Sequence, residues 1–316
     1  MGSIVERIER DLAIPGLAER LAKIDPSDLT SLLLAVDRAR TAAKKPSRIL
    51  AEYHNNRFVR PAATDPRRMI AWERLAYGCL PSGFVPVAMS PLAPLGACSV
   101  VAGTNQDWSI GTARNAEVVS DATNVLALEA CSRRAGLLRA GPGPRSAVRL
   151  ATAQRVVRPQ KYKSPTALPH FSLFGLCSAG RDPGAHRFEI DALVEHGRFF
   201  LTAIGRALAE PLVLTLSVFD PSETWLRIAE AAAAALARAF PDAAIARDDA
   251  RTAGRGYYTG IAFHVHAIDP AGAKIQLADG GFVDWAEQLL GNRKERMAIS
   301  GAGSDRVVAL AGDRIE

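Results

Sequence analysis

The sequence predicts an α+β protein in which a helical extension precedes a main domain. Three observations predict this class. Apolar residues recur at three- and four-residue spacing over 29–39, behind a helix-start signal at Ser27. Helical spacing over 187–208 is followed by an extended apolar run over 211–219. The turn sequence Asp269-Pro270-Ala271-Gly272 separates two extended runs, which indicates a hairpin.

We expect residues 1–64 to form the helical extension and residues 65–316 to form the main domain. Pro15 and Pro26 divide the first 45 residues into separate helical pieces. Residues 43–65 are polar and contain prolines, so this stretch is interpreted as a connector.

The remaining pattern alternates helices with strands. The segments between turn signals favour helices at 69–80, 120–135 and 222–240, and strands at 83–89 and 148–157. Pro142 and Pro144, which lie between glycines, predict a loop.

The composition indicates a soluble cytoplasmic protein. The chain has 316 residues with 48% hydrophobic and 23% charged side chains, no apolar run long enough to span a membrane, and several acids near its start. The net charge of +6 suits a phosphate-bearing ligand, although basic clusters are usually solvated. The four cysteines form no C-x-x-C pair and are expected to be buried free thiols: Cys79, Cys98, Cys131 and Cys177.

Three short motifs follow one another along the main domain. The first is a glycine, an apolar strand and a proline over 83–91. The second is Arg155 on a strand, then Arg158-Pro159-Gln160-Lys161, a loop through Lys163 and Pro165, and a return strand His170-Phe171-Ser172-Leu173-Phe174. The third is Gly301-Ala302-Gly303-Ser304-Asp305-Arg306, which opens a helix.

The residue types in these motifs suit a nucleotide. An arginine on a rigid strand can donate two hydrogen bonds to a phosphate and balance the charge that develops there. An aromatic ring can stack on a base, and glycines allow the backbone to approach a nucleotide closely. Arg155 and Arg158 could instead be solvated strand-edge charges.

In this order the motifs resemble those of class II aminoacyl-tRNA synthetase catalytic domains, over residues 65–312. The resemblance implies an antiparallel sheet flanked by helices, a homodimer, and ATP with Mg²⁺ as cofactors. It also implies that Arg155 binds the α-phosphate, that Phe174 stacks on adenine and that Arg306 reaches the γ-phosphate. The other residues implied at the nucleotide site are Arg158, His170, Gly303 and Asp305.

Further segments resemble the histidyl branch of this family. Residues 254–263 (Gly-Arg-Gly-Tyr-Tyr-Thr-Gly-Ile-Ala-Phe) are similar to its Arg-Gly-Leu-Asp-Tyr-Tyr-Thr-Gly signature, and 279–284 to its Gly-Gly-Arg-Tyr-Asp turn. Ser120-Asp121-Ala122-Thr123 resembles the Pro-Glu-Gly-Thr turn that holds a substrate amino group, although Asp121 could equally be an acid at a helix start. The resemblance implies substrate contacts from Asp121, Thr123, Tyr257, Tyr258, Gly280 and Gly281.

Departures from the pattern argue against histidine as the substrate. The glutamate that accepts from adenine in the family is replaced by Val157, and the branch's catalytic arginine by Ala253; Arg255 or Arg251 could reach the same space. Imidazole-recognising residues are replaced by Leu176 and Gly180, so the pocket wall near Leu176 is apolar and leaves imidazole nitrogens unpaired.

We expect tRNA charging to be excluded, because only ten residues follow Arg306 and leave no room for an anticodon-binding domain. The leading hypothesis is ATP-dependent activation of an amino acid other than histidine, or of a related carboxylate, as an adenylate that passes to an amine, thiol or carrier. One alternative is a non-catalytic regulatory subunit of ATP phosphoribosyltransferase. Another is a synthetase-derived module that binds RNA or protein.

No metal site is predicted from ligand spacing. His264 and His266 share one strand face, but no third ligand lies nearby in sequence, so a satisfied or exposed pair is the favoured interpretation.

Overall fold

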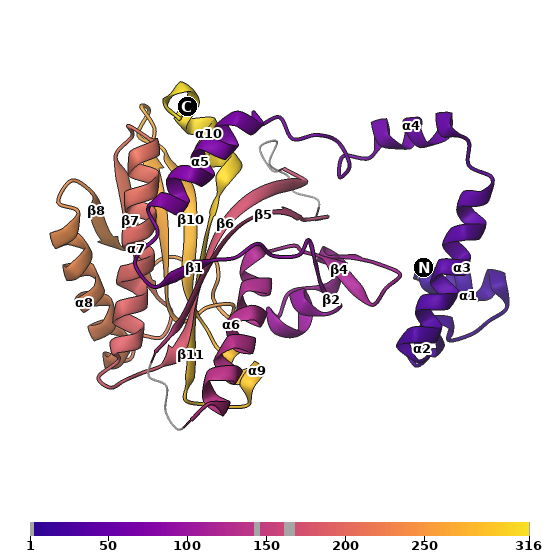
Figure 1. Cartoon of the computed structure of the whole chain (residues 1–316), viewed down its shortest axis with the longest axis horizontal. Coiled ribbons are helices and arrows are strands. Elements are labelled where there is room, and N and C mark those ends of the chain that lie inside the picture. The colour runs from indigo at the N-terminus through magenta and orange to yellow at the C-terminus, as the bar shows by residue number, and fades with distance from the viewer. Residues whose placement is uncertain (1–2, 142–145, 161–167, 316) are drawn as a thin grey trace.

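The computed structural model describes residues 3–141, 146–160 and 168–315. Its centre is an eight-stranded sheet in the order β1-β5-β6-β11-β10-β9-β7-β8 (Figure 1). All neighbours are antiparallel except β1 with β5 and β7 with β8. The strands are β1 (Phe84–Pro86), β5 (Val148–Val157), β6 (His170–Arg181), β7 (Leu212–Val218), β8 (Ala244–Arg247), β9 (Thr259–Ile268), β10 (Lys274–Val283) and β11 (Glu295–Gly303).

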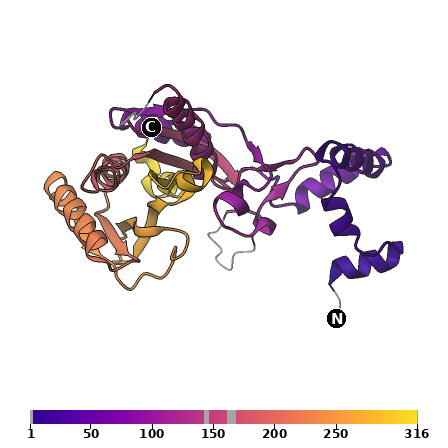
Figure 2. The ribbon, with the colours of Figure 1, turned by 90° about the horizontal axis from the view of Figure 1, so that it is seen from below.

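Helices cover both faces of this sheet (Figures 1 and 2). One face, called the α7 face below, carries α5 (Pro66–Gly78), α7 (Arg187–Ala207), α8 (Glu223–Ala239) and α10 (Ser304–Ala311). The other, called the α6 face, carries α6 (Ala122–Arg139) and α9 (Trp285–Leu290). The α+β class with a largely antiparallel sheet between helices is therefore confirmed.

Alternation along β6 shows how the strand sequence builds both cores. Phe174 and Leu176 pack into the α7 face, whereas Leu173 and Cys177 pack into the α6 face. Gly175 lies directly under α6, where an added Cβ would come within 3.2 Å of a Leu126 methyl. The side-chain period of two in a strand thus decides which layer each residue joins.

Helix starts follow their capping chemistry. Asp121 caps α6 by accepting the backbone N–H of Thr123, and Asp65 caps α5 in the same way through Arg67. β11 ends at Gly303, which is the residue before α10, as the third motif predicts. All four cysteines are free, and three of them are buried, in agreement with the sequence interpretation.

Between β1 and α6, a smaller sheet and two short helices cross the α6 side of the domain. The sheet has the order β2 (Leu92–Pro94), β4 (Ala116–Val118), β3 (Ile110–Gly111), and the helices are η1 (Ala97–Val101) and η2 (Gln106–Trp108). Glu117 ties them together because it accepts from Gly96, Cys98 and Gln106.

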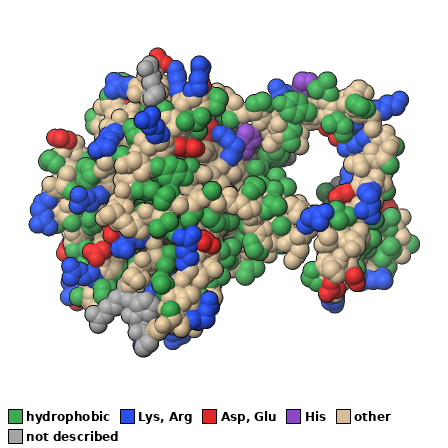
Figure 3. Space-filling view, in the orientation of Figure 1, with side chains coloured by type: hydrophobic (Ala, Val, Ile, Leu, Met, Phe, Trp, Pro, Cys, Tyr) green, Lys and Arg blue, Asp and Glu red, His purple; other side chains and the backbone are tan. Residues whose placement is uncertain are grey.

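The N-terminal extension consists of four helices that stand away from the sheet (Figures 1 and 2). They are α1 (Ile4–Leu12), α2 (Leu17–Ala22), α3 (Pro26–Ala42) and α4 (Pro46–Asn55), and none contains a buried residue. Several of their hydrophobic side chains lie on the surface (Figure 3).

Two predicted segments differ from the structure, and two predicted loops lie outside the described residues. The connector expected over 43–65 contains helix α4, because Pro46 occupies its first turn, where proline starts a helix rather than breaking it. The glycine pair at 280–281 lies inside β10 rather than in a turn. The loops expected around Pro142 and Pro144 and through Lys161, Lys163 and Pro165 lie outside the described residues.

No helix among the described residues is both long and apolar enough to cross a membrane.

An ion cluster with a fully buried Arg134–Glu295 pair joins α6 to the sheet. Glu295 accepts from Arg134 Nε at 2.7 Å and from Arg181 Nε at 2.6 Å, and the side chains of Arg134 and Glu295 have no exposed surface. Removing one charge from such a cluster leaves the opposite charges in a medium that solvates them poorly.

We therefore expect Glu295→Gln to lower the free energy of unfolding by about 3–5 kcal/mol, measured by urea denaturation. The matched control is Glu129→Gln, which breaks the exposed Arg133–Glu129 pair of the same helix and is expected to cost about 0–1 kcal/mol. Equal losses in the two variants would contradict this account.

Candidate functional site

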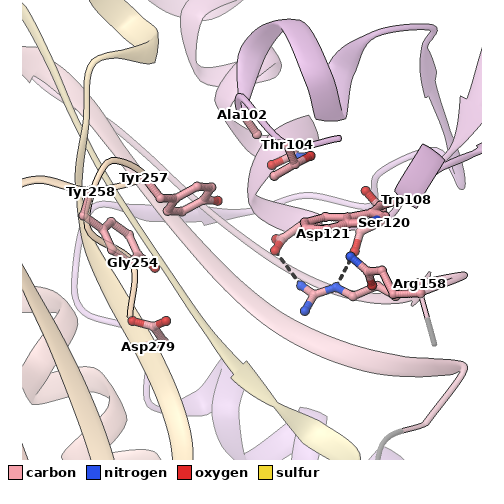
Figure 4. A pocket seen from close by; sticks show the side chains of 12 residues that line it. Ala102, Thr104, Trp108, Ser120, Asp121, Arg158, Gly254, Tyr257, Tyr258 and Asp279 are labelled. Atoms are coloured by element: carbon pink, nitrogen blue, oxygen red, sulfur yellow. Dashed lines mark hydrogen bonds and ion pairs between the residues drawn. The ribbon is translucent and has the colours of Figure 1, made fainter. Parts of the chain in front are cut away.

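A pocket of about 280 Å³ opens on the α6 face, between the start of α6, the η1–η2 segment and the turn that precedes β9 (Figure 4). Its walls combine two acids, an arginine, two tyrosines and several small polar groups. The lining residues are Ala102, Thr104, Trp108, Ser120, Asp121, Asn124, Arg158, Gln160, Gly254, Tyr257, Tyr258 and Asp279.

Asp121 both caps α6 and faces this pocket. Its Oδ1 accepts from the backbone N–H and the hydroxyl of Thr123 at 2.9 and 2.8 Å, and its Oδ2 accepts from Arg158 Nη2 at 2.7 Å. Arg158 is fixed further by donating from Nε to the Ser120 carbonyl at 3.0 Å. A carboxylate offers about four acceptor positions, so Asp121 can take one more donor from a ligand. Asp121 is therefore an acid at a helix start, and its recognition of a substrate amino group stays a prediction.

Asn124 follows one helical turn later and presents an unsatisfied acceptor. The residue is 5% exposed, lines the pocket, and has a buried Oδ1 atom that no donor in the described part of the chain contacts. Leaving a buried acceptor without a donor costs about 1–3 kcal/mol, which a ligand donor would recover. Sequence reasoning missed Asn124, although its three-residue spacing from Asp121 places both on one helix face.

The two tyrosines form the inner wall. Their rings meet edge to face at 4.8 Å, and Tyr257 also packs on Trp285. Burial raises the pKa of Tyr257 and of Tyr258, so both hydroxyls stay protonated and can donate.

The glycine pair of β10 divides between the two sheet faces. Gly281 lies under Tyr258, because an added Cβ would come within 2.7 Å of that ring. Gly280 faces the other side, where a Cβ would come within 2.4 Å of Ser300. Gly281 therefore supports the pocket wall, while the expected substrate contact from Gly280 is wrong: this residue packs into the α7 face.

Arg251 lies behind the pocket-lining residue Asp279. Its side chain is 4% exposed, donates from Nε to the Ala253 carbonyl at 2.8 Å, and donates from Nη2 to Asp279 at 3.1 Å. The remaining Nη1 is buried and has no partner among the described residues. Arg255, the other candidate, is exposed and lies over Phe219 at 5.7 Å. Of the two positions considered from sequence, Arg251 is the one that bonds a residue of the pocket wall.

Arg155 and Phe174 lie on the opposite side of the sheet from this pocket. Register pairs Arg155 with Ser172 and Ala153 with Phe174, which directs these side chains to the α7 face. Phe174 has no exposed surface and stacks on Phe199 at 5.3 Å, so it is not available to stack on adenine. Leu176 shares that face, so it does not line the pocket as expected. The sequence pattern does not determine which face of the sheet the side chains of β5 and β6 take.

Arg155, His170 and Asp305 form a polar cluster that holds the extension. Asp305 accepts from the Thr64 hydroxyl at 2.5 Å and from the Ser172 backbone at 2.6 Å, and lies 3.6 Å from Arg155. His170 Nε2 donates to the Arg60 carbonyl at 2.7 Å, so its Nδ1 accepts from Arg155 at 3.1 Å. The expected nucleotide contacts from these three residues are therefore replaced by contacts within the chain.

Other second- and third-motif residues lie on the α6 face. Phe171 lies on this face beneath the Arg158 guanidinium, which is 5.0 Å from the ring centroid. The third-motif glycines Gly301 and Gly303 leave a patch of the sheet without side chains, called the bare glycine floor below. Neither glycine has a positive φ, and Cβ atoms built on them would meet no atom closer than 3.7 and 3.9 Å. These glycines are required neither by backbone conformation nor by packing, which suits the close approach of a ligand.

Arg306 lies beside this floor. Its Cβ is the nearest atom to a Cβ built on Gly303, and its Nη1 donates to the Gln276 carbonyl of β10 at 2.5 Å. Arg155 lies beside Asp305 instead. The two guanidinium groups thus contact different parts of the chain, and their convergence on one triphosphate stays a prediction.

One group of possible metal ligands lies elsewhere. Among the described residues, Asp182, His186 and Glu189 bring ligand atoms within 4.8 Å of one another. Asp182 already accepts three backbone N–H groups, and Glu189 lies 3.3 Å from Arg296, so we assign no metal to them.

Comparison with solved structures identifies the class of fold. The chain is similar to the apo histidyl-tRNA synthetase of S. aureus, with 14% identity and a TM-score of 0.61 over 80% of this chain and 68% of that one. It is similar to an ATP phosphoribosyltransferase regulatory subunit/histidyl-tRNA synthetase from Bacillus halodurans, with 12% identity and a TM-score of 0.59 over 78% of each chain. A chain of the ATP phosphoribosyl transferase (HisG:HisZ) complex from Thermotoga maritima matches with 13% identity and a TM-score of 0.50, over 76% of this chain and 97% of that one.

The chain therefore has the fold of a class II aminoacyl-tRNA synthetase catalytic domain, as its motifs predict. A scan against protein-family profiles and a search of curated proteins both find no match.

The two faces of β6 can be distinguished by substitution. We expect Phe174→Ala to lower the free energy of unfolding by about 3–5 kcal/mol, because it opens a cavity in the α7-face core. Phe171→Ala serves as the control and is expected to cost less, because its ring is only partly buried. Urea denaturation measures both, and a larger loss in Phe171→Ala would contradict the assignment of faces.

Proposed function

We propose that this chain binds an amino acid other than histidine, or a related carboxylate, in the α6-face pocket and activates its carboxylate with ATP as an adenylate. The observation that carries the proposal is Arg251, a buried arginine with one unpartnered N–H group beside the pocket. It occupies the neighbourhood where the resemblance implies a catalytic arginine and where Ala253 stands in the sequence. A guanidinium held in place before the reaction can stabilise charge that develops on the carboxylate and phosphate oxygens.

Substrate recognition in this proposal uses two acceptors at the start of α6. The α-ammonium group donates to Asp121, which has an acceptor position left, and to Asn124 Oδ1, which has no other donor. The carboxylate then points toward Arg251 Nη1 and the tyrosine hydroxyls. This placement pairs each buried polar atom that the chain itself leaves unsatisfied at the pocket.

The nucleotide in this proposal lies at the Gly303 end of the bare glycine floor. Gly303 leaves the required space, Arg306 borders it, and Phe171 offers an aromatic ring on the same face. ATP, when bound, would supply the adenylyl group: a carboxylate oxygen would attack the α-phosphorus, the anhydride bond between the α- and β-phosphates would break, and pyrophosphate would leave. Asp305 is taken up by Thr64 and Ser172, so we assign no residue to Mg²⁺. The acceptor that receives the activated acid is an amine, thiol or carrier.

The proposed assembly is a homodimer. Val85, Leu92 and Leu95 are exposed apolar side chains on or beside the first motif, which the resemblance assigns to a dimer interface. Apolar side chains concentrated in one segment of a surface commonly mark a protein contact.

A non-catalytic regulatory subunit of ATP phosphoribosyltransferase is the second candidate. The observation that favours it is the placement of Arg155, which pairs with Asp305 and His170 on the α7 face, while Val157 stands where the family has an adenine-binding glutamate. In this candidate the pocket binds an effector and no activation follows.

An amino-acid panel in an ATP–pyrophosphate exchange assay tests the proposal. We expect exchange with at least one amino acid other than histidine, and a loss of about 10²–10³-fold in Arg251→Ala, because one charge-stabilising donor is removed. Arg255→Ala is the matched control, since Arg255 is exposed on the same segment, and exchange should change little.

Three results separate the alternatives. Exchange that survives Arg251→Ala contradicts the assigned role of Arg251. Amino-acid binding measured by calorimetry without exchange, together with stimulation of a short-form ATP phosphoribosyltransferase, supports the second candidate. Absence of both binding and exchange across the panel contradicts both.

A further inference from the structure

The far end of the pocket carries a second carboxylate, on Asp279 of β10. Figure 4 shows Asp121 and Asp279 on opposite sides of the pocket with Tyr257 between them. Both charges act on the Tyr257 hydroxyl and, after burial, contribute to the raised pKa of this tyrosine, which places the phenol within the field of both acids.

Asp279 is held by its neighbours through one oxygen only. Oδ1 accepts from Arg251 Nη2 at 3.1 Å and lies 3.6 Å from His264 Nε2 on the adjacent strand β9. Asp279 Oδ2 accepts no hydrogen bond from any donor among residues 3–141, 146–160 and 168–315. The side chain is 36% exposed, whereas the Arg251 side chain that orients it is 4% exposed.

Space beside Asp279 is open toward β11. Its cross-strand partner there is Gly301, where a Cβ would meet no atom closer than 3.7 Å. On the other side, Tyr258 covers Gly281 and so closes the strand face two residues further along. Asp279 is therefore a fixed acceptor with an open approach, at the end of the pocket away from the amino-group site.

We infer that Asp279 selects the substrate, and that the pocket takes amino acids whose side chain ends in a hydrogen-bond donor. This inference rests on the proposed amino-acid site. With the α-ammonium group at Asp121 and Asn124, the side chain passes Tyr257 and its terminal donor binds Asp279 Oδ2. A terminal methyl group in the same place would leave that carboxylate oxygen desolvated without a donor, and sites of this kind reject such analogues strongly.

The terminal donor of the substrate side chain could be a hydroxyl or an ammonium group, and binding measurements can distinguish the two. A hydroxyl and an ammonium group both donate, but an ammonium group also adds a positive charge close to Arg251, which already balances Asp279. Isosteric amino acids separate these contributions, because homoserine, 2,4-diaminobutyrate and norvaline differ only in the terminal hydroxyl, ammonium or methyl group. The series one carbon longer is 5-hydroxynorvaline, ornithine and norleucine.

Calorimetry with both series tests the inference on the full chain. We expect the wild-type protein to bind at least one donor-bearing member about tenfold or more tightly than its methyl isostere. Asp279→Asn should reduce this ratio at least about tenfold for an ammonium terminus, because the charge of the acceptor is removed, while binding of the methyl isostere is retained. Asp284→Asn is the matched control: Asp284 is exposed, lies about 17 Å further along the strand direction and should leave the ratio unchanged.

The outcomes bear separately on the two proposals. Equal affinities across each isosteric series, or an unchanged ratio in Asp279→Asn, would overturn the inference and leave the amino-acid site standing. An equal loss for all three isosteres in Asp279→Asn would also overturn it, because Asp279 would then act only by positioning Arg251. Failure of every amino acid to bind the wild-type chain would overturn the proposed function and, with it, this inference.

Discussion

The alternation of side chains across the central sheet is the constraint on which the rest of this structure depends. Helices cover both faces, so each strand residue joins either the α7-face core or the α6 face that carries the pocket. A shift of one position exchanges the two environments. For this reason Phe171 and Phe174, three residues apart on β6, have different surroundings: one lies under Arg158 and the other between aromatic rings in the core.

The pocket is built from charge pairs that the chain completes only in part. Arg158 balances Asp121 and Arg251 balances Asp279, so the charges are compensated without a ligand. What remains unsatisfied is a set of single atoms, above all Asn124 Oδ1 and Arg251 Nη1. Asn124 lines the pocket and Arg251 is bonded to the lining residue Asp279, so a polar ligand that supplies both a donor and an acceptor would satisfy these two atoms.

The second-motif region illustrates how a motif can persist while its geometry serves another purpose. Arg155 and His170 stand where phosphate contacts are implied, yet with Asp305 they bind the segment that leads from the extension, through Arg60 and Thr64. The Asp305 side chain is 3% exposed and each of its oxygens already accepts a hydrogen bond within the chain. The same residues therefore favour an anchoring role for this cluster.

The sequence by itself determined the class of fold, the order of most helices and strands, and two segments that form the pocket: the Asp121 turn and the Tyr257–Tyr258 pair. These features depend on local periodicity, capping and turn chemistry, which are properties of neighbouring residues. Only the tertiary structure decided that Arg251 rather than Arg255 bonds the pocket wall, that Asn124 and Asp279 line the pocket, and that Arg155 and Phe174 face away from it. The reason is that strand parity and the path of an irregular segment are fixed by packing between residues far apart in sequence, and local patterns do not encode that packing.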